Sequence, residues 1–470
     1  MKVFKYINRI FSVALDIVFV LLLLGVYQLG LIPAKYLVIF SLLIIILGIL
    51  FTFLSFRLKK MLLSIILFIF MLLFSILSLV GIYYVRTTNS FFDTLTEVKE
   101  KQMYYVVVKK DSDYSNLKDL NNKSMAIFEN QSENYNNALN KVKNDIKVKE
   151  KKYTNMNTIV KDLFNGNIDS LLINSNVKKI LDENIMAFKE NTKIIAKFSI
   201  NIDKQENKDS EINNSSFNIL ISGIDTYGNI NNVSRSDINI IMTVNPNVHK
   251  ILLTSVQRDM YVQLHGTTGL KDKLTHAGLY GINMSIQTIE DFLDIDIPYY
   301  IRVNFDSAAK LIDSIGGVDI YNDIAFKGYS SFFAKGDIHL NGEQTVDYSR
   351  ARKQLPNGDW TRGEHQKVVI TAIINKIANS KELLLNYGDI LNSTKDVVQT
   401  NVPTDLIKQL VKNQLSTMSP WNITSTFVGG SGSDYRETYS MPGMNLYITY
   451  PDENSVKNVS KQINDLLSER

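Results

Sequence analysis

The stretch Phe217-Asn-Ile-Leu-Ile-Ser-Gly-Ile-Asp225 is a β-rich apolar run that ends on a glycine, an isoleucine and a carboxylate. Two more apolar runs follow it, Ile238–Val244 and Ile251–Val256, with turn-rich segments between them. Short apolar runs between turns are typical of buried strands. These three runs therefore predict the core strands of one sheet.

Apolar residues recur with helical spacing further along, in Ile282–Phe292, Phe305–Ile315 and Trp360–Ile377. Thr345–Ala351 is predicted as a further strand. Strands combined with amphipathic helices indicate an α/β fold, with a central sheet flanked by helices.

Charged side chains stand where the first three strands begin and end. They are Asp225, Arg235, Asp237, Arg258 and Asp259. Three parallel strands would bring them to one edge of the sheet, where open α/β sheets bind ligands. Asp225 and Asp237 could share one Mg²⁺ ion, which takes carboxylates together with phosphate oxygens. Taken singly, each aspartate is equally well explained as a turn or cap residue.

A second charged group lies about ninety residues later. Arg350 and Arg352 fall in a predicted strand, whose alternation would place both guanidinium groups on one face. The arginine fork matches phosphate oxygens, and an anion would relieve the repulsion between two arginines. Arg362 and Gln366 share a helix face near a helix start that favours anions, and Asp359 precedes them as an N-cap, a base or an orienting residue. The two groups together predict a pyrophosphate-handling site.

Other signals exclude several classes of chemistry. The chain has no cysteine, which excludes disulfides and thiol catalysis, and its net charge of +4 gives no reason to expect nucleic acid as a partner. There is no nucleophile elbow, Walker loop or dinucleotide fingerprint. His276 is interpreted as a structural hydrogen-bonding residue, and His365 is predicted to lie on an exposed helix face.

The N-terminal part predicts three membrane spans, at residues 11–33, 37–56 and 61–84. Basic residues gather before the first span and between the second and third, which predicts a cytoplasmic N-terminus and an extracellular C-terminal part. Asp16 falls inside the first span. A carboxylate near the interface at a helix end is the favoured interpretation, and a buried polar contact in the membrane is the alternative.

The rest of the chain divides by composition. Residues 1–85 form the membrane domain, and residues 86–200 are predicted to be a small α/β accessory domain that begins with a connector at 86–100. Residues 201–215 are a polar linker, and residues 216–470 are the main domain.

The charged residues belong to an ordered series of short motifs. They are Ile219-Leu-Ile-Ser-Gly-Ile-Asp225, Arg235-Ser-Asp237, Ser255-Val-Gln-Arg-Asp259, Lys273-Leu-Thr-His-Ala277, Val303-Asn-Phe-Asp306, Ile315-Gly-Gly-Val-Asp319, Leu340-Asn-Gly-Glu343, Tyr348-Ser-Arg-Ala-Arg352, Asp359-Trp-Thr-Arg362 and Gln366. This series resembles the LytR–CpsA–Psr family of bacterial cell-wall ligases, and three spans with an accessory domain resemble its streptococcal capsule-type members. One departure is Gln257, where the family usually has proline; we expect changed backbone stiffness and no loss of chemistry.

The resemblance implies a phosphotransferase that joins a glycopolymer, carried on a polyprenyl pyrophosphate, to peptidoglycan through a phosphodiester. It implies Mg²⁺ held by Asp225 and Asp237. It implies a pyrophosphate cradle of Arg235, Arg258, Arg350, Arg352, Arg362 and Gln366, and a catalytic set of Arg258, Asp259, Arg350, Arg352 and Asp359. Whether Asp259 or Asp359 is the general base stays open.

The expected polymer is capsular polysaccharide first and a teichoic-acid-like polymer next. Expected partners are the lipid-linked polymer, peptidoglycan, membrane lipid and other polysaccharide assembly proteins. The family's apolar lipid tunnel could be lined by residues between 279 and 333, which could equally be ordinary core. Two rival functions are a non-catalytic regulator of lipid-linked polymer assembly and a polyprenyl pyrophosphate phosphatase.

Overall fold

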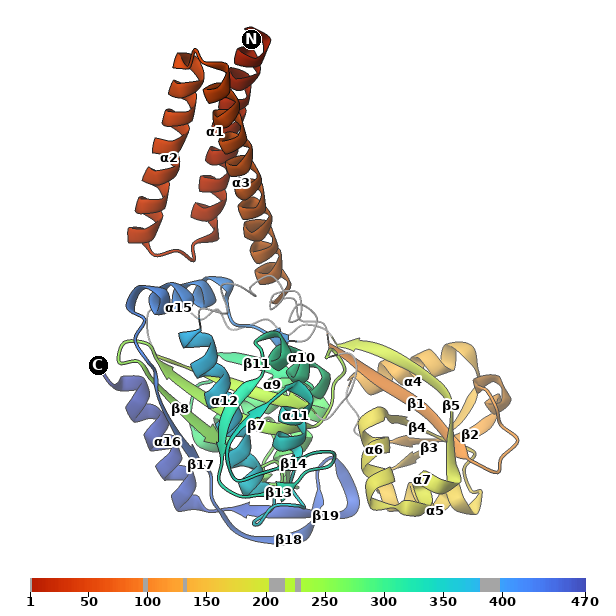
Figure 1. The fold of residues 1–470 in the computed structure, drawn as a ribbon. Coiled ribbons are helices and arrows are strands. Elements are labelled where there is room, and N and C mark those ends of the chain that lie inside the picture. Colours follow the sequence, from red (N-terminus) through yellow and green to blue (C-terminus); the bar gives the residue numbers. More distant parts are fainter. Residues whose placement is uncertain (1, 96–99, 130–132, 203–215, 225–229, 381–397) are drawn as a thin grey trace. The chain divides into compact units, whose positions relative to one another are not determined.

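The computed structural model describes residues 2–95, 100–129, 133–202, 216–224, 230–380 and 398–470 (Figure 1). The chain forms two compact units. The first comprises Met1–Thr96, Ile374–Lys395 and Val402–Pro420, and the second comprises Glu97–Ile373, Asp396–Asn401 and Trp421–Arg470. Asp225 and residues 203–215 of the predicted linker lie outside the described residues.

The first unit contains three long apolar helices, α1 Lys2–Leu29, α2 Ala34–Arg57 and α3 Met61–Leu95, together with α15 Thr404–Thr417. Each of the first three includes a stretch long and apolar enough to cross a membrane, so the three predicted apolar segments are confirmed as helices. The predicted connector at 86–100 is wrong in its first part, because α3 continues to Leu95.

Asp16 corrects the favoured interpretation of the first span. It lies near the middle of α1, and its Oδ2 accepts a hydrogen bond of 2.8 Å from Thr52 Oγ1 of α2. Gly48 leaves room for this contact, since a Cβ there would stand 2.6 Å from Asp16 Oδ1. The aspartate is therefore a polar contact between two spans, the alternative that the sequence left open.

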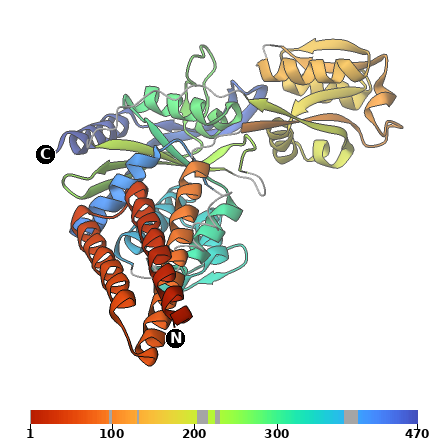
Figure 2. The ribbon, with the colours of Figure 1, turned by 90° about the horizontal axis from the view of Figure 1, so that it is seen from above.

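The accessory domain is a mixed five-stranded sheet with helices on both faces (Figure 2). Its strands, in the order β3-β2-β4-β1-β5, are β1 Glu100–Lys109, β2 Lys123–Phe128, β3 Val148–Tyr153, β4 Ser170–Asn174 and β5 Thr192–Ile202. Its helices are α4 Glu133–Asp145, α5 Met156–Asn165, α6 Ser175–Asn184 and α7 Met186–Asn191. The alternation of β1 explains the two layers: Val106 packs with α4, and Val107 packs with α5 and α6.

The C-terminal domain, the rest of the second unit, is built on a six-stranded sheet of order β16-β11-β6-β7-β8-β17. Its strands are β6 Phe217–Ile224, β7 Ser236–Asn245, β8 Lys250–Ser255, β11 Tyr299–Val303, β16 Val398–Thr400 and β17 Asn422–Phe427. The main helices are α8 Leu274–Ala277, α9 Ile282–Leu293, α10 Phe305–Ser314, α11 Gly342–Arg350, α12 Asp359–Asn379 and α16 Glu453–Ser468. The predicted α/β fold class is confirmed.

One apolar core joins this sheet to α9 and α16. Leu220 of β6 and Ile241 of β7 pack with Ile289 of α9 and Ile463 of α16, all fully buried or nearly so. The apolar residues of α9 therefore lie in ordinary core, and the lipid tunnel stays a prediction. Short strand pairs complete the domain: β9 Tyr261–Val262 with β10 Asp272–Lys273, β12 Val318–Asn322 with β15 Gly336–Leu340, β13 Phe326–Lys327 with β14 Phe332–Phe333, and β18 Gly430–Thr438 with β19 Met441–Pro451.

Two sequence predictions about this domain are wrong. The first three strands are antiparallel neighbours, β6 with β7 and β7 with β8. Residues 345–351 do not form a strand, because they belong to α11 and the turn after it. Asn341 caps that helix through a capping box with Gln344, which makes a helix the favoured local structure.

The accessory and C-terminal domains are joined within the second unit by polar and apolar contacts. Arg302 of β11 is almost fully buried and forms an ion pair with Glu100, the first residue of β1. Its Nη1 also donates to Gln399 Oε1 at 3.1 Å. Met441 and Met444 of β19 pack with the apolar core that lies beneath α5 and α6.

Candidate functional site

The charged residues meet at one sheet edge although the strands are antiparallel. The end of β6 pairs with the start of β7, where Ile224 stands opposite Ser236. The end of β8 reaches the same edge, because Ser255 pairs with Ile240. Because the three strands alternate in direction, the ends of β6 and β8 and the start of β7 lie at the same edge. Arg235, Asp237 and the residues after Ser255 therefore lie together, as the sequence predicted, although it assumed parallel strands.

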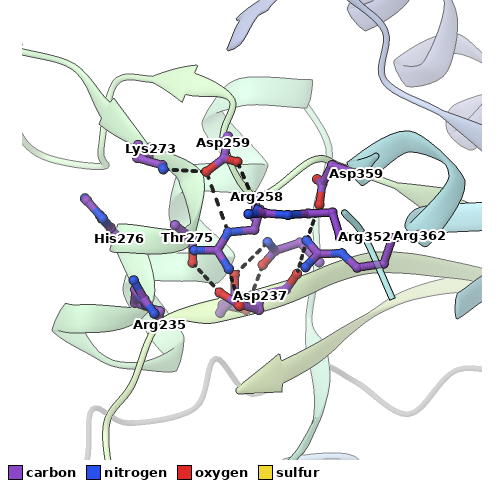
Figure 3. A network of polar contacts seen from close by, with 12 residues as sticks. Arg235, Asp237, Arg258, Asp259, Lys273, Thr275, His276, Arg352, Asp359 and Arg362 are labelled. Atoms are coloured by element: carbon purple, nitrogen blue, oxygen red, sulfur yellow. Dashed lines mark hydrogen bonds and ion pairs between the residues drawn. The ribbon is translucent and has the colours of Figure 1, made fainter. Parts of the chain in front are cut away.

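Asp237 lies at the centre of the network (Figure 3). One carboxylate oxygen forms an ion pair with Arg258, and the other accepts a hydrogen bond of 3.0 Å from Thr275 Oγ1. Burial alone would raise the pKa of Asp237, but the charges of Arg258, Arg235 and Arg362 lower it to about 2. The carboxylate is therefore ionised at neutral pH.

Asp259 is the second buried carboxylate, and cations surround it. Its Oδ1 lies 2.5 Å from Lys273 Nζ and 3.6 Å from Arg258 Nε, and its Oδ2 lies 3.8 Å from Arg352 Nη1. Burial opposes ionisation, but Lys273 and Arg258 hold its pKa below the usual aspartate value. Figure 3 shows the Arg258 guanidinium between Asp237 and Asp259.

Asp359 differs from the other two carboxylates in its electrostatics. It forms an ion pair with Arg362, three residues further along α12. Burial raises the pKa of Asp359 above its usual value, and the attraction of Arg362 does not offset that effect. The repulsion of Asp259 adds to the rise. Two neighbouring aspartates with pKa values shifted in opposite directions are a common feature of acid–base sites.

A pocket opens where these elements meet. It is lined by Asp237, Asn239, Ser255, Val256, Gln257, Arg258, Asp359, Trp360, Arg362, Gly363 and Gln366. The start of α12 approaches the end of β8 closely, because a Cβ on Gly363 would stand 3.3 Å from Ser255 Oγ. The pocket combines arginine donors with an acidic group of raised pKa, which suits an anionic ligand and a proton transfer.

Gln366 and Arg350 have different surroundings. Gln366 lines the pocket, and its Nε2 donates to Ser349 O at 3.1 Å, which ties α12 to α11. Arg350, the last residue of α11, lies over the rings of Phe305 and Tyr329, with its Cζ 4.1 Å and 5.5 Å from their centroids. Because residues 350–352 do not form a strand, the same-face pairing of Arg350 with Arg352 is a wrong prediction.

The guanidinium group of Arg235 binds a residue of the accessory domain. Its Nη1 lies 2.7 Å from Glu183 Oε2, and its Nη2 lies 2.8 Å from Glu183 Oε1. Arg235 is buried and close enough to affect the pKa of Asp237. It does not line the pocket described above.

The predicted metal pair can be assessed for one member. Asp237 is an ionised carboxylate in the pocket, which fits a Mg²⁺ ligand whose shell phosphate and water complete. Asp225 lies outside the described residues. Within the part of the chain that the structure describes, no group of three or more His, Asp or Glu side chains could hold a metal alone.

The two histidines discussed above are both structural. His276 is buried, with Nδ1 2.7 Å from Asp272 Oδ1, in line with its predicted role. His365 was predicted to be exposed, which is wrong. It is buried and stacks on the rings of Tyr348 and Phe326, at centroid distances of 4.2 Å and 5.2 Å, and burial lowers its pKa to about 4.

Sequence reasoning gave no role to three residues of the network: Lys273, Thr275 and Glu183. Lys273 and Thr275 lie in a motif that was noted for its histidine, so their polar character was the available signal. Glu183 had no signal, because it precedes Arg235 by 52 residues and belongs to another domain.

The chain is similar to several known proteins. The sequence profile of the LytR_cpsA_psr family matches residues 183–464. The polyisoprenyl-teichoic acid–peptidoglycan teichoic acid transferase TagU of Bacillus cereus is 35% identical over 252 residues, covering 53% of this chain and 79% of that protein. TagU of Bacillus subtilis is 31% identical over 282 residues, covering 58% and 86%. The crystal structure of B. subtilis TagV is 29% identical, has a TM-score of 0.47, and covers 55% of this chain and 100% of that one.

The family profile spans more than half of the chain and includes every residue named above for the charged network. The two TagU sequences align over most of their own length. On this evidence the chain belongs to the LytR–CpsA–Psr family.

Proposed function

We propose that this protein is a membrane-anchored phosphotransferase that moves a wall glycopolymer from a polyprenyl pyrophosphate carrier to peptidoglycan. The observation that carries the proposal is the pocket in which Asp237, Arg258, Asp359 and Arg362 converge. The names of the TagU relatives support it, because they describe transfer of teichoic acid from a polyisoprenyl carrier to peptidoglycan.

The arginines would bind the pyrophosphate. Arg258 and Arg362 line the pocket, and Arg352 lies at 3.8 Å from Asp259 beside it. Guanidinium groups bind phosphate oxygens through two parallel charge-assisted hydrogen bonds. Each of these arginines is now paired with an aspartate, so the incoming phosphate oxygens would replace or share those partners.

The reaction would be a displacement at the phosphorus that carries the polymer. An acceptor hydroxyl of peptidoglycan forms the new P–O bond, while the anhydride P–O bond breaks and polyprenyl phosphate leaves. Negative charge builds on the leaving group, where Arg258 and Arg362 can stabilise it. The pyrophosphate bond supplies the driving force, so no nucleotide is required.

Asp359 is the candidate general base. A base must accept the hydroxyl proton, and a carboxylate whose pKa is raised toward neutrality does so better than one whose pKa is lowered. Asp359 lines the pocket and has a raised pKa, whereas Asp259 is held as an anion by Lys273. We assign Asp259 the role of positioning Arg258 and Arg352.

Mg²⁺ is proposed as the cofactor. Asp237 would supply one carboxylate ligand, with Asp225 as the second in the prediction from sequence. When bound, the ion would neutralise charge on the phosphate oxygens.

The location follows from the spans. Three apolar helices, each long enough to cross a membrane, support a membrane anchor. The basic residues around Arg9 and Arg57 favour a cytoplasmic N-terminus, which would place the accessory and C-terminal domains outside. A lipid-linked substrate held in the outer leaflet would then be on the same side of the membrane as the C-terminal domain.

Reconstitution of the full chain with a lipid-pyrophosphoryl oligosaccharide, a peptidoglycan oligomer and Mg²⁺ tests the proposal. A covalent product joined through a phosphodiester is the expected result, and parallel reactions with capsule-type and teichoic-acid-type donors would rank the polymers. Release of phosphorylated polymer alone would indicate a phosphatase. Tight binding of the donor without turnover would indicate a regulator, and either outcome would overturn the proposal.

A further inference from the structure

The accessory domain contributes a carboxylate to the arginine cluster. Glu183 stands one residue before the end of α6, and both of its oxygens bind Arg235, at 2.7 and 2.8 Å. The Arg235 side chain is 7% exposed and that of Glu183 is 45% exposed, so the pair lies at the rim of the charged network. This two-pronged geometry is the one with which arginine binds phosphate.

Two further contacts hold helix α6 and strand β1 against the residues that precede Arg235. Asn176, at the start of α6, donates to Val233 O at 2.9 Å, two residues before Arg235. Lys101 of β1 pairs with Asn232 in a parallel bridge. These contacts fix the end of α6 beside the start of β7, so the meeting of Glu183 with Arg235 is part of a built interface.

We propose that Glu183 is a positioning residue that sets the affinity of the site for pyrophosphate, because it competes with phosphate oxygens for the fork of Arg235. The inference rests on the proposed function. The two terminal nitrogens that bind Glu183 cannot at the same time bind a phosphate through the same fork. Pyrophosphate must therefore displace Glu183 from Arg235 before it can bind there. Until then, the Glu183 carboxylate occupies the position that the substrate would take.

The charges around the pair support exchange between two anions. Burial opposes ionisation of Glu183, but its hydrogen bonds from Arg235 and the charges of Arg235, Lys179 and Arg258 lower its pKa. Glu183 thus stays ionised at neutral pH and feels Arg258 of the pocket. Its partial exposure lets the carboxylate turn to solvent when a stronger anion arrives.

Titration of the full-length protein with inorganic pyrophosphate tests the inference. Glu183→Gln keeps the size of the side chain and removes its charge, so the Kd for pyrophosphate should fall about three- to tenfold, in the range of one ordinary hydrogen bond. The KM for a polyprenyl pyrophosphate donor should fall by a similar factor, while kcat changes by less than about twofold. A role in stability alone would lower the melting temperature without tightening pyrophosphate binding.

Two further variants make the test specific. Asp182→Asn removes a charge from the neighbouring position of α6, where Asp182 pairs with Lys178 at 2.7 Å, and should leave the Kd unchanged. In an Arg235→Ala background, Glu183→Gln should no longer tighten binding. If Glu183→Gln lowers the melting temperature, Glu183→Asp replaces it, and its shorter carboxylate should give a smaller decrease in Kd.

Unchanged or weaker pyrophosphate binding by a folded Glu183 variant would overturn the inference. The binding assay contains no acceptor, so its outcome is separate from that of the proposed function. Tighter pyrophosphate binding without transfer in any variant would leave the competition in place and remove the transferase proposal. Normal transfer with no effect of Glu183→Gln on pyrophosphate binding would overturn the competition and leave the transferase proposal in place.

Discussion

The accessory and C-terminal domains share an architecture of a sheet flanked by helices, but their carboxylates have different partners. Asp169 of the accessory domain accepts hydrogen bonds from Tyr114 Oη at 2.7 Å, Ser124 N at 2.8 Å and Ser124 Oγ at 2.6 Å. All of these donors are neutral. Asp237 of the C-terminal domain has Arg258 as a direct partner, with Arg235 and Arg362 near enough to lower its pKa.

The difference separates a structural carboxylate from one in a ligand site. Neutral donors satisfy Asp169, and the charge of Lys123 is the smallest of the influences that lower its pKa. The network around Asp237 contains cations whose carboxylate partners an anion can replace, and removing either charge leaves the other buried. Substitutions in the two domains should therefore have different consequences, and the following predictions run from the largest expected effect to the smallest.

Arg258→Ala should have the largest effect, because it removes a pocket donor and leaves Asp237 without its ion-pair partner. We expect transfer to fall by about a thousandfold. The measurement is transfer per folded molecule in the reconstituted assay. Arg258→Lys keeps the charge without the fork and should recover only part of the activity; near-normal transfer by the alanine variant would remove Arg258 from the mechanism.

Asp359→Asn should lower kcat by about a hundredfold or more, the contribution of a general base. Since the pKa of Asp359 is raised, wild-type activity should fall with decreasing pH at a pH above the usual aspartate range, and the variant should lack this step. A raised pKa in the folded state contributes stability at low pH that is lost as the pH rises through that pKa. The uncharged asparagine should therefore keep the melting temperature at pH 7 at least as high as that of the wild type.

The contrast with Asp259 makes this prediction sharper. Asp259→Asn should disturb Arg258, Arg352 and Lys273 and weaken donor binding more than it lowers kcat. If Asp259→Asn, and not Asp359→Asn, removes the acidic limb of the pH profile, the assignment of the base is reversed.

Lys273→Met should have an intermediate effect. The change removes the cation at 2.5 Å from Asp259, so the pKa of Asp259 should rise and its hold on Arg352 should weaken. We expect a decrease in transfer of about tenfold, because the positively charged arginines around the pocket stay in place. Lys273→Arg is the matched control and should retain most of the activity. A loss as large as that of Arg258→Ala would place Lys273 in direct contact with substrate.

Asp169→Asn should leave transfer per folded molecule unchanged. It exchanges a carboxylate for an amide that cannot accept from all three donors, at a cost of about 1–2 kcal/mol in the stability of the accessory domain. Native-state hydrogen exchange of the amides in β2 and β4 measures that cost. A strong loss of transfer without faster exchange would contradict the distinction between the two domains.

Local patterns were enough to predict several elements of the C-terminal domain. The predicted first strand coincides with β6, and the helices at Ile282 and Phe305 begin where α9 and α10 begin. Apolar periodicity determines such elements because each buries one face or stripe in the sheet core. It does not determine strand direction, although the few residues between β7 and β8 are too short for a parallel crossover.

Part of the site could also be predicted from local sequence patterns. Asp237, Arg258, Asp359, Arg362 and Gln366 come together because each stands at an end of a strand or helix that the sequence marks. The position of Arg350 was missed because residues 345–351 were predicted to be a strand, whereas the capping box at Asn341 starts a helix there. The partner of Arg235 could not be found in this way, since a carboxylate in another domain leaves no local pattern.

The ion pair of Arg302 with Glu100 has a consequence for the modularity of the protein. Domains that meet through solvated surfaces can be exchanged or deleted independently. Here the Arg302 guanidinium is almost fully buried, and its partner carboxylate, Glu100, belongs to the other domain. A soluble fragment that starts at residue 216 would carry an unpaired cation inside its sheet, a defect of several kcal/mol. The smallest stable fragment should therefore start before Glu100. The accessory and C-terminal domains should also have been kept together during evolution.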